Sequence, residues 1–408
     1  MDGARIKVLA CAFAFALIAA GCGESDDAGS GGANGKSGGP PLSTCGRWIV
    51  DGAGRRVKLA GVNWYGASDT ELVVGGLDVV SLNQVAQTIE ELGFNSVRLP
   101  FSHVMLHVTD PVAHAHIAAN PELEGKTPLE VYDSVIDALT RAHIFVILNS
   151  HTNHAMWCCG LDDDGVWYSS DYSEERFMQD WEMLAERYAS NAFVVGADLR
   201  NEIRPALGGD PLIVPTWGGG GATDWHEAAT RAGNRVLAKN PNLLIFVEGL
   251  DSADNLMGVR DLPVVLAVKS KLAYESHQYS FFPSPPGDFR NPYEGMDAAG
   301  LKAASYGKWG YIMDQGQPYT APVLLGEFGA SSQNAWMDNL EAYLVELDMD
   351  YTYWPINGGP KASGDSEPYG LLEDDWTTVR RDGRIEALKT LQKATRGPGI
   401  DGPVGVCD

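Results

Sequence analysis

The chain has 408 residues, and its 54 Asp and Glu against 30 Lys and Arg give a formal net charge of −24. Nucleic-acid binding needs Lys and Arg to displace counterions from phosphates, so this charge argues against that class of protein. The 47 Gly and 11 Trp indicate a loop-rich globular protein rather than a helical bundle or a coiled coil. The length alone leaves the number of domains open.

The first 22 residues have the pattern of an export signal. Arg5 and Lys7 precede an apolar run over residues 8–20, which is too short to cross a bilayer as a helix. The run ends in the letters AAGC at residues 19–22, which resemble a bacterial lipobox with Cys22 as the lipidated first residue of the mature chain. We therefore expect an exported, extracellular or cell-surface lipoprotein of a bacterium. The alternative is an ordinary signal peptide with an incidental Cys.

Residues 23–44 are rich in Gly, Ser and Asp and end near Pro40-Pro41, a composition that predicts a flexible tether rather than a core. Residues 45–408 then remain for one folded domain. No other stretch is apolar enough to cross a membrane, so the lipid at Cys22 is the expected membrane contact, and a monomer is expected.

Four further Cys allow three disulfide connectivities: Cys45, Cys158, Cys159 and Cys407. We favour a Cys45–Cys407 bond, which would clasp the two ends of the domain, and a bond between the adjacent Cys158 and Cys159. The alternative for the adjacent pair is two free, buried thiols.

From residue 45 onward, short apolar runs alternate with helical patterns. The runs lack strict alternation, as expected for strands buried on both faces. They cover Leu59–Asn63, Ser96–Pro100, Ile144–Asn149, Phe193–Leu199, Leu243–Glu248, Leu272–Ser276, Pro322–Gly326 and Asp350–Trp354. Because parallel strands need crossover helices, eight such units predict an α/β fold that is a single (β/α)₈ TIM barrel.

The helical segments between the runs have recognisable beginnings. Ser81 with Gln84, and Thr127 with Glu130, have the spacing of a capping box, and Pro128 suits a first helical turn. Apolar stripes at spacings of three and four follow, so Trp181 in the second stripe is expected in the core. The stripes are Leu129, Tyr132, Ile136 and Leu139, then Phe177, Trp181, Leu184 and Tyr188.

The connections that leave the strands are long, whereas those that enter them are tight. The long ones cover 101–127, 151–173, 203–223, 279–298 and 355–377. A barrel builds its active site from the loops at the carboxyl ends of its strands. Glu202 follows the fourth run and Glu327 follows the seventh, so two carboxyl groups should meet at that face. Such a pair suits glycoside hydrolysis, although each Glu could instead only pair with a nearby Arg.

Here the chain resembles the family 5 glycoside hydrolases, the cellulase-like members of the retaining barrel group, over roughly residues 45–395. The resemblance rests on separated positions in the right order, not on any one of them. They are Arg98 at the end of the second strand, His151 at the third, Asn201-Glu202, His277-Gln278-Tyr279, Glu327 in Gly326-Glu327-Phe328-Gly329, and Trp354. The chain departs from the usual family pattern at Asn149, where Asp is common, and at Ile203-Arg204, which separate Glu202 from Pro205.

The resemblance implies a nucleophile at Glu327, an acid/base at Glu202 and retention of anomeric configuration. It further implies that Asn201 bonds the sugar 2-hydroxyl and that His151 and His277 orient sugar hydroxyls and the carboxyl groups. We expect a raised pKa for Glu202 and a low pKa for Glu327, because Arg98 and the Tyr279 hydroxyl favour the charged form of Glu327. Arg98 could instead form a plain salt bridge of the barrel.

Trp354 is the expected platform beneath the scissile sugar, because aromatic faces suit the C–H groups of pyranose rings. Other Trp near the leaving loops could flank it or simply pack, namely Trp64, Trp157, Trp167 and Trp217. The remaining ones are assigned to structure, namely Trp48, Trp225, Trp309, Trp336 and Trp376.

His114-x-His116 has the spacing of metal ligands, with His103 and His107 nearby. A metal-dependent barrel hydrolase usually carries His-x-His after its first strand, where this chain has Asn63-Trp64-Tyr65. We therefore expect a solvated loop over residues 103–116, with no metal and no cofactor.

These observations favour a retaining β-glycosidase, an endo-acting β-1,4-glucanase that acts on polysaccharide or oligosaccharide. A β-mannanase or a glycoconjugate β-glycosidase of the same fold is the alternative. A catalytically silent carbohydrate-binding protein and a metal-dependent amidohydrolase are two further ones. The intact acid pair argues against the binder, and the missing first-strand ligands argue against the amidohydrolase.

Overall fold

The computed structural model describes residues 39–208, 212–283, 289–290, 292–361, 364–404 and 407. The expected signal, the lipidation site Cys22 and most of the expected tether lie outside the described residues. The last part of that tether belongs to the fold, because Leu42 is fully buried and Ser43–Cys45 forms strand β1. The expected boundary at residue 44 therefore falls a few residues too late.

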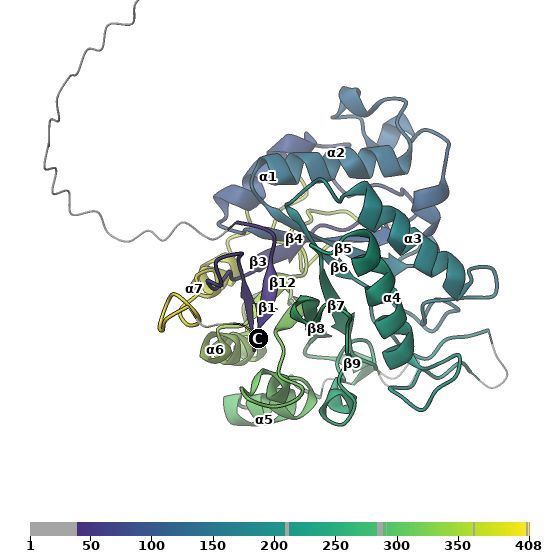
Figure 1. Cartoon of the computed structure of the whole chain (residues 1–408). Coiled ribbons are helices and arrows are strands. Elements are labelled where there is room, and N and C mark those ends of the chain that lie inside the picture. The colour runs from purple at the N-terminus through teal and green to yellow at the C-terminus, as the bar shows by residue number, and fades with distance from the viewer. Residues whose placement is uncertain are drawn as a thin grey trace, which may run out of the picture. The chain divides into compact units, whose positions relative to one another are not determined.

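Eight parallel strands close into a barrel in the order β11-β12-β3-β4-β5-β6-β7-β8 (Figure 1). They are β3 (Ala60–Asn63), β4 (Ser96–Ser102), β5 (Phe145–Thr152), β6 (Val194–Asp198), β7 (Leu244–Glu248), β8 (Leu272–His277), β11 (Val323–Glu327) and β12 (Asp350–Tyr353). Each of the eight expected runs supplies one of these strands, which confirms the predicted (β/α)₈ barrel.

Helices surround the strands (Figure 1). They are α1 (Leu82–Glu91), α2 (Pro128–Arg141), α3 (Glu174–Arg187), α4 (Trp225–Lys239), α5 (Ala298–Lys308), α6 (Ala335–Leu347) and α7 (Arg384–Leu391). Short 3₁₀ helices are η1 (Val104–His107), η2 (His114–His116), η3 (Pro121–Leu123), η4 (Met257–Arg260), η5 (Lys269–Lys271) and η6 (Gly310–Met313). None of the described helices is long and apolar enough to cross a membrane.

The expected helix beginnings are confirmed. Thr127 and Glu130 form a complete capping box with Pro128 in the first turn, and Ser81 accepts from the backbone N–H of Gln84. One expected helix is missing: in the fully described stretch between β7 and β8, only η4 and η5 replace it. The crossover there is therefore made without an α-helix.

The amino end of the barrel interior is apolar and sealed. Leu42 and Ile49 come from the segment before β3, which includes the hairpin of β1 and β2 (Trp48–Val50). They pack with inward side chains of the strands, such as Phe145, Phe246 and Leu324, and all of these are buried. The N-terminal segment thus plugs the barrel end that lies opposite the expected site.

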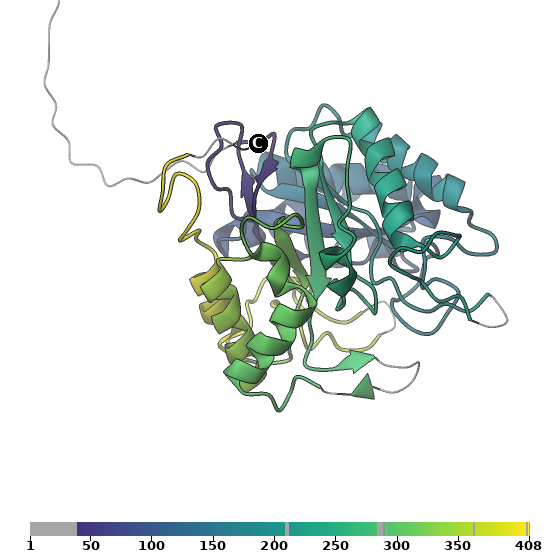
Figure 2. The ribbon, with the colours of Figure 1, turned by 60° about the horizontal axis from the view of Figure 1, so that its bottom comes forward.

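Farther along the same strands, the inward positions become polar. On β5, Ile147 is followed at the next inward position by Asn149, and on β7 Phe246 is followed by Glu248. This period of two is the ordinary alternation of a strand. Figure 2 shows the long loops gathered at the end toward which the strand arrows point, where a two-stranded ribbon of β9 (Phe282–Pro283) and β10 (Phe289–Arg290) also lies.

Both expected disulfides are present. Cys45 and Cys407 are bonded across 362 residues of sequence, and Cys158 is bonded to Cys159. The first bond ties the two ends of the folded domain together at β1, which confirms the expected clasp.

Replacing Cys45 and Cys407 by Ser should lower the free energy of unfolding by about 2–5 kcal/mol, because the bond closes a very long loop in the unfolded chain. Urea unfolding of the parent and of the double variant measures this difference. The catalytic rate at a temperature where both are folded should not change, since the bond lies at β1 and the site lies at the other end of the barrel. Equal stability would contradict a stabilising clasp.

Candidate active site

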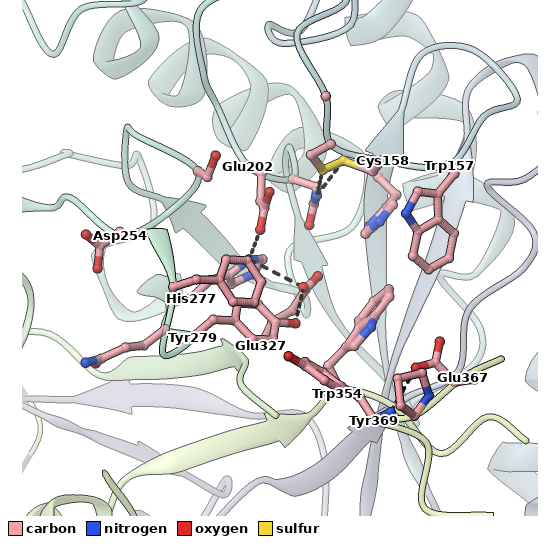
Figure 3. A pocket seen from close by; sticks show the side chains of 18 of the residues that line it. Trp157, Cys158, Glu202, Asp254, His277, Tyr279, Glu327, Trp354, Glu367 and Tyr369 are labelled. Carbon is pink, nitrogen blue, oxygen red and sulfur yellow. Dashed lines mark hydrogen bonds and ion pairs between the residues drawn. A yellow bond between two sulfur atoms is a disulfide. The ribbon is translucent and has the colours of Figure 1, made fainter. Parts of the chain in front are cut away.

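A cavity of about 480 Å³ opens at the carboxyl end of the barrel (Figure 3). Seven of the eight predicted site residues line it, namely His151, Asn201, Glu202, His277, Tyr279, Glu327 and Trp354. Arg98 is fully buried and contacts two of these residues from inside the barrel. The structure therefore gathers all of the predicted residues, which come from six different strands or the loops that follow them.

Two carboxyl groups share this cavity. Glu327 is the last residue of β11, and Glu202 follows β6. A side-chain oxygen of Glu202 and one of Glu327 lie within 4.8 Å of each other, with His277 between them. The backbone of Glu202 has a φ of 46°, in the left-handed region that favours Gly. Such strain concentrates at functional sites, where surrounding contacts hold the residue in place.

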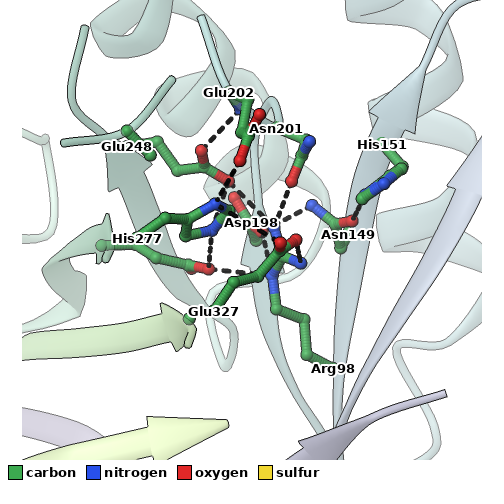
Figure 4. Close-up of polar contacts among 12 residues, drawn as sticks. Arg98, Asn149, His151, Asp198, Asn201, Glu202, Glu248, His277 and Glu327 are labelled. Carbon is green, nitrogen blue, oxygen red and sulfur yellow. Dashed lines mark hydrogen bonds and ion pairs between the residues drawn. The ribbon is translucent and has the colours of Figure 1, made fainter. Parts of the chain in front are cut away.

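Arg98 on β4 lies beneath this pair and uses all of its N–H groups (Figure 4). Its Nε donates to Asp198, Nη1 donates to Asn63 and Glu327, and Nη2 donates to Asn201 and Glu248, over 2.7–3.0 Å. A buried charge with so many charge-assisted bonds is compensated for its loss of hydration. Arg98 is thus both a barrel ion pair and a direct partner of Glu327.

The pKa of Glu202 is raised from its ordinary value of 4.5 to about 7, mainly because burial disfavours the charged carboxylate. Arg204 and Arg98 lower the pKa and oppose this shift. At neutral pH a substantial share of Glu202 therefore carries a proton, as a general acid requires. The expected raised pKa is confirmed.

The expected low pKa of Glu327 is wrong in direction. Burial raises the pKa of Glu327, and the opposing effects of His277, Arg98 and the Tyr279 hydrogen bond do not cancel it. These partners are in place, since Arg98 donates over 2.8 Å and the Tyr279 hydroxyl donates over 3.0 Å. The residue types alone indicated the stabilising partners but not the depth of burial.

Two histidines adjoin the carboxyl groups. The Nδ1 of His277 lies 3.1 Å from Glu202 and 3.7 Å from Glu327. Burial lowers the pKa of His277 to about 4, so the ring is neutral near pH 7. The Nδ1 of His151 lies 2.8 Å from the Asn149 oxygen, and the amide of Asn149 donates to Asp198 over 2.6 Å. Asn149 therefore supplies a bridge at the position where the family often has Asp.

Asn201 is held from two sides. Its oxygen accepts from Arg98 over 2.7 Å, and its amide nitrogen lies 3.5 Å and 3.4 Å from the sulfur atoms of Cys158 and Cys159. These contacts set which edge of the amide faces the cavity. The adjacent Cys pair is therefore part of the wall of the cavity.

An aromatic group forms another wall (Figure 3). The Trp354 ring stacks on Tyr65 at 5.1 Å between ring centroids, and Trp157 is 45% exposed and lies edge-on to both. Lys361 lies over the Trp157 ring at 4.3 Å. Trp157 and Trp354 can thus offer apolar surface to a ligand in the cavity.

The other Trp side chains pack. Trp64 and Trp167 are fully buried, and Trp217 packs against Gly258 and Leu262, away from the residues that line the cavity. The Trp assigned to structure are buried, as is Trp181, which confirms their core positions. They are Trp48, Trp225, Trp309, Trp336 and Trp376.

The expectation of a solvated His loop is only partly right. His103 is fully buried between Asp180 and Ser150, whereas His114 is exposed beside Glu124. Groups of described side chains close enough to hold a cation lie only at the acid pair and just below it, namely Cys158, Cys159 and Glu202; Glu202, His277 and Glu327; and Glu248, Glu275 and His277. The absence of a metal stays a prediction.

Sequence reasoning missed the carboxyl groups around Arg98, which are Asp198, Glu248 and Glu275. They lie at or near the ends of otherwise apolar runs, and that was the available signal. A charged residue inside an apolar barrel strand has to face a partner, and Arg98 in the run Ser96–Pro100 is such a partner. Lys361 and Glu367, which line the cavity from the loop 355–377, carry no such signal, and neither does Tyr65, whose hydroxyl donates to Glu367 over 2.6 Å.

A closed (β/α)₈ barrel with two facing carboxyl groups at the carboxyl ends of its strands defines a glycoside hydrolase. Residues 50–359 match the model of the cellulase family, glycosyl hydrolase family 5. The chain belongs to this family.

Related sequences agree with this assignment. The chain is 35% identical to an endoglucanase of Paenibacillus polymyxa over 358 residues, which covers 83% of this chain and 84% of the relative. It is 32% identical to the major extracellular endoglucanase of Xanthomonas campestris pv. campestris, over 85% of this chain and 70% of the relative.

Solved structures are similar as well. An endocellulase of Pyrococcus horikoshii in complex with cellotetraose has a TM-score of 0.73 at 29% identity, and the match covers 86% of this chain and 98% of that one. The catalytic domain of the Xanthomonas campestris enzyme has a TM-score of 0.72 at 30% identity, with 86% and 99% covered.

The raised pKa of Glu202 predicts a pH-dependent stability. Because the folded pKa of about 7 exceeds the ordinary value of 4.5, the folded state binds more protons, so stability is lost as pH rises between these values. Glu202→Gln should remove this loss and gain up to about 3 kcal/mol relative to the parent between pH 4 and pH 8. Urea unfolding at both pH values tests it, and a pH-independent difference would contradict the shift.

Proposed function

We propose that this protein is a retaining endo-β-1,4-glucanase that cleaves cellulose-like polysaccharides by double displacement. The distance between the carboxyl groups supports retention: oxygens of Glu202 and Glu327 lie within 4.8 Å. Retaining enzymes hold their carboxyl groups about 5 Å apart, whereas inverting enzymes leave about 6.5–9.5 Å for a water molecule. The endo action on β-1,4-glucan is supported by relatives named endoglucanase and endocellulase.

In the first step, Glu327 attacks the anomeric carbon while Glu202 donates its proton to the departing glycosidic oxygen. Arg98 and Tyr279 fix the attacking carboxylate through its two oxygens. The pKa of Glu202 near 7 keeps a proton available for the leaving group. The product is a covalent glycosyl-enzyme and a shortened sugar chain.

In the second step, Glu202, now a carboxylate, removes a proton from water, and the water oxygen attacks the anomeric carbon. The bond to Glu327 breaks and both carboxyl groups return to their starting state. Neutral His277 lies within 3.7 Å of both Glu202 and Glu327 and holds their side chains in position without adding a charge.

The cavity walls supply the sugar contacts in this proposal. Trp354 and Trp157 offer apolar faces to pyranose rings, and Asn201 offers its amide to the 2-hydroxyl. His151 orients hydroxyl groups on the Trp354 side, where the two rings stack at 5.6 Å. The net charge of −24 does not oppose a neutral polymer substrate.

The direct test is a panel of soluble β-glucan, mannan, xylan and aryl glycosides, assayed for new reducing ends and for product configuration. Glu327→Gln should lower the turnover of the preferred substrate by at least about 10³-fold and leave the fold intact, because the nucleophile is lost. Glu341→Gln is the matched control: Glu341 is also buried, burial also raises its pKa to about 7, and it lies on α6 away from the cavity.

Three results would contradict parts of this proposal. Full activity of Glu327→Gln would remove the assigned nucleophile, and inversion of configuration would remove the two-step mechanism. Release from mannan alone would move the substrate to the mannanase alternative and leave the mechanism standing.

We also propose that the protein is exported and held at a bacterial surface through a lipid on Cys22, as a monomer without a cofactor. This proposal rests on the apolar run and the AAGC letters at residues 19–22. The relative from Xanthomonas campestris is named extracellular, which supports export.

Cys22→Ser should abolish lipidation and move activity from the membrane fraction into soluble fractions. Fractionation of cells that express the full chain, with incorporation of labelled palmitate, measures both. Cys11→Ser is the control, because Cys11 lies inside the apolar run. Unchanged membrane retention without label would support an ordinary signal peptide instead.

A further inference from the structure

The barrel interior places four carboxyl groups around the single positive charge of Arg98, and two of the five N–H groups of Arg98 bond amides instead. The side chains of Asp198, Glu248, Glu275 and Glu327 each have an oxygen within 3.0 Å of the guanidinium. All four are buried, and Arg98 supplies one positive charge. Buried charges without partners are costly, so the placement of protons among these groups decides the electrostatics of the site.

The four carboxyl groups do not accept the same number of hydrogen bonds. Glu248 accepts with both oxygens, from Arg98 over 3.0 Å and from the backbone N–H of Glu202 over 2.7 Å. Glu327 also accepts with both oxygens, from Arg98 and Tyr279. These two side chains have the bonding pattern of ionised carboxylates.

Glu275 on β8 differs, because neither of its oxygens has a hydrogen-bond partner among the described residues. Apart from Arg98, the nearest N–H group of a basic side chain is Nε2 of His277, at 3.5 Å. It lies 2.8 Å from the Nε of Arg98, but that N–H is directed to Asp198. Its carboxyl group packs tightly against β11: a Cβ on Gly326 would lie 1.7 Å from Oε1 of Glu275. An ionised Glu275 would therefore be a buried carboxylate with unfilled acceptors.

Asp198 also has one oxygen that accepts no hydrogen bond from the part of the chain that the structure describes. Its Oδ2 accepts from Arg98 and from Asn149, whereas its buried Oδ1 has no partner among the described residues. Glu275 and Asp198 adjoin, because each places a carboxyl oxygen 2.8 Å from the same atom, Nε of Arg98. A proton on one oxygen of Glu275 would turn that oxygen into a donor for Asp198 and would fill the open acceptor there.

We propose that Glu275 is a neutral carboxylic acid in the working enzyme and acts as a positioning residue that donates a hydrogen bond to Asp198. The groups that face it are Arg98 from β4, Asp198 from β6, Glu248 from β7, His277 from β8 itself and Glu327 from β11. Most of these charged neighbours are carboxylates, which favour the uncharged form of Glu275. Burial and Asp198 raise the pKa of Glu275 well above its ordinary value, and they do the same to the pKa of Glu248. The N–H donors that Glu248 has and Glu275 lacks therefore distinguish the two groups.

The proton has a consequence for the reaction. With Glu275 neutral, Arg98 keeps its Nε for Asp198 and its Nη groups for Glu248, Asn201 and Glu327. The nucleophile Glu327 then faces the positive charge of Arg98, and no carboxylate at Glu275 competes with it for that charge. This consequence rests on the proposed function, whereas the proton on Glu275 does not.

Infrared difference spectroscopy between the parent and Glu275→Gln, at pH 8 and without substrate, reads the proton directly. We expect the parent to show the carbonyl band of a protonated carboxylic acid that is absent from the variant. A lost carboxylate band instead would overturn the proposal. Because no turnover is needed, this result is independent of whether the glucanase assignment holds.

Kinetics supply the second test. Glu275→Ala should lower kcat/KM at least about tenfold, because Asp198 loses its donor, and Glu275→Gln should restore it to within about threefold, because the amide can donate in the same place. Glu248→Gln is the matched contrast on the neighbouring strand. There the amide N–H₂ would face an N–H donor, so a loss of about 10²-fold is expected.

The pH profile distinguishes a neutral Glu275 from a merely structural one. If Glu275 is neutral, Glu275→Gln leaves the charge near Glu327 unchanged, so the limbs of the kcat/KM profile should not move. A displacement of the acidic limb by about one pH unit would mean that Glu275 is ionised in the parent and would overturn the proposal. If Glu275→Ala does not fold, the comparison of Glu275→Gln with Glu248→Gln still decides.

Discussion

The site depends on one buried guanidinium. Arg98 reaches from β4 to groups on or just after β3, β6, β7 and β11, and each N–H has an acceptor. Removing a charge from water costs several kcal/mol unless such bonds replace its hydration, so the surrounding carboxyl and amide groups are constrained to this arrangement. The same bonds hold the proposed nucleophile and Asn201 in place, and they leave no N–H of Arg98 for Glu275.

The barrel separates stability from chemistry along its axis. At the amino end, inward positions are filled by apolar side chains such as Ile147 and Phe246, and Leu42 and Ile49 close that end. Two residues farther along, the same strands present Asn149 and Glu248. Burying ionisable groups near the carboxyl end costs free energy. The apolar packing at the amino end offsets this cost, as is usual for this fold.

The fold could be predicted because its signal is local: each barrel strand is an apolar run, and turn and cap residues mark the helices. The missing helix between β7 and β8 could not be, since tertiary packing decides that segment. The acid pair was predictable from its position after two strands. The raised pKa of Glu327 and the role of Glu275 were not, because both depend on burial and on which donors are already used, and only the three-dimensional arrangement determines these.

The plug at the amino end of the barrel also decides how the enzyme meets its surroundings. Because Leu42 lies in that plug, the chain enters the domain at the pole opposite the cavity. A lipid at Cys22, as proposed, would therefore be joined to the domain at the sealed pole and not beside the cavity. A bulky polymer could then approach the cavity without competing with the surface that holds the enzyme.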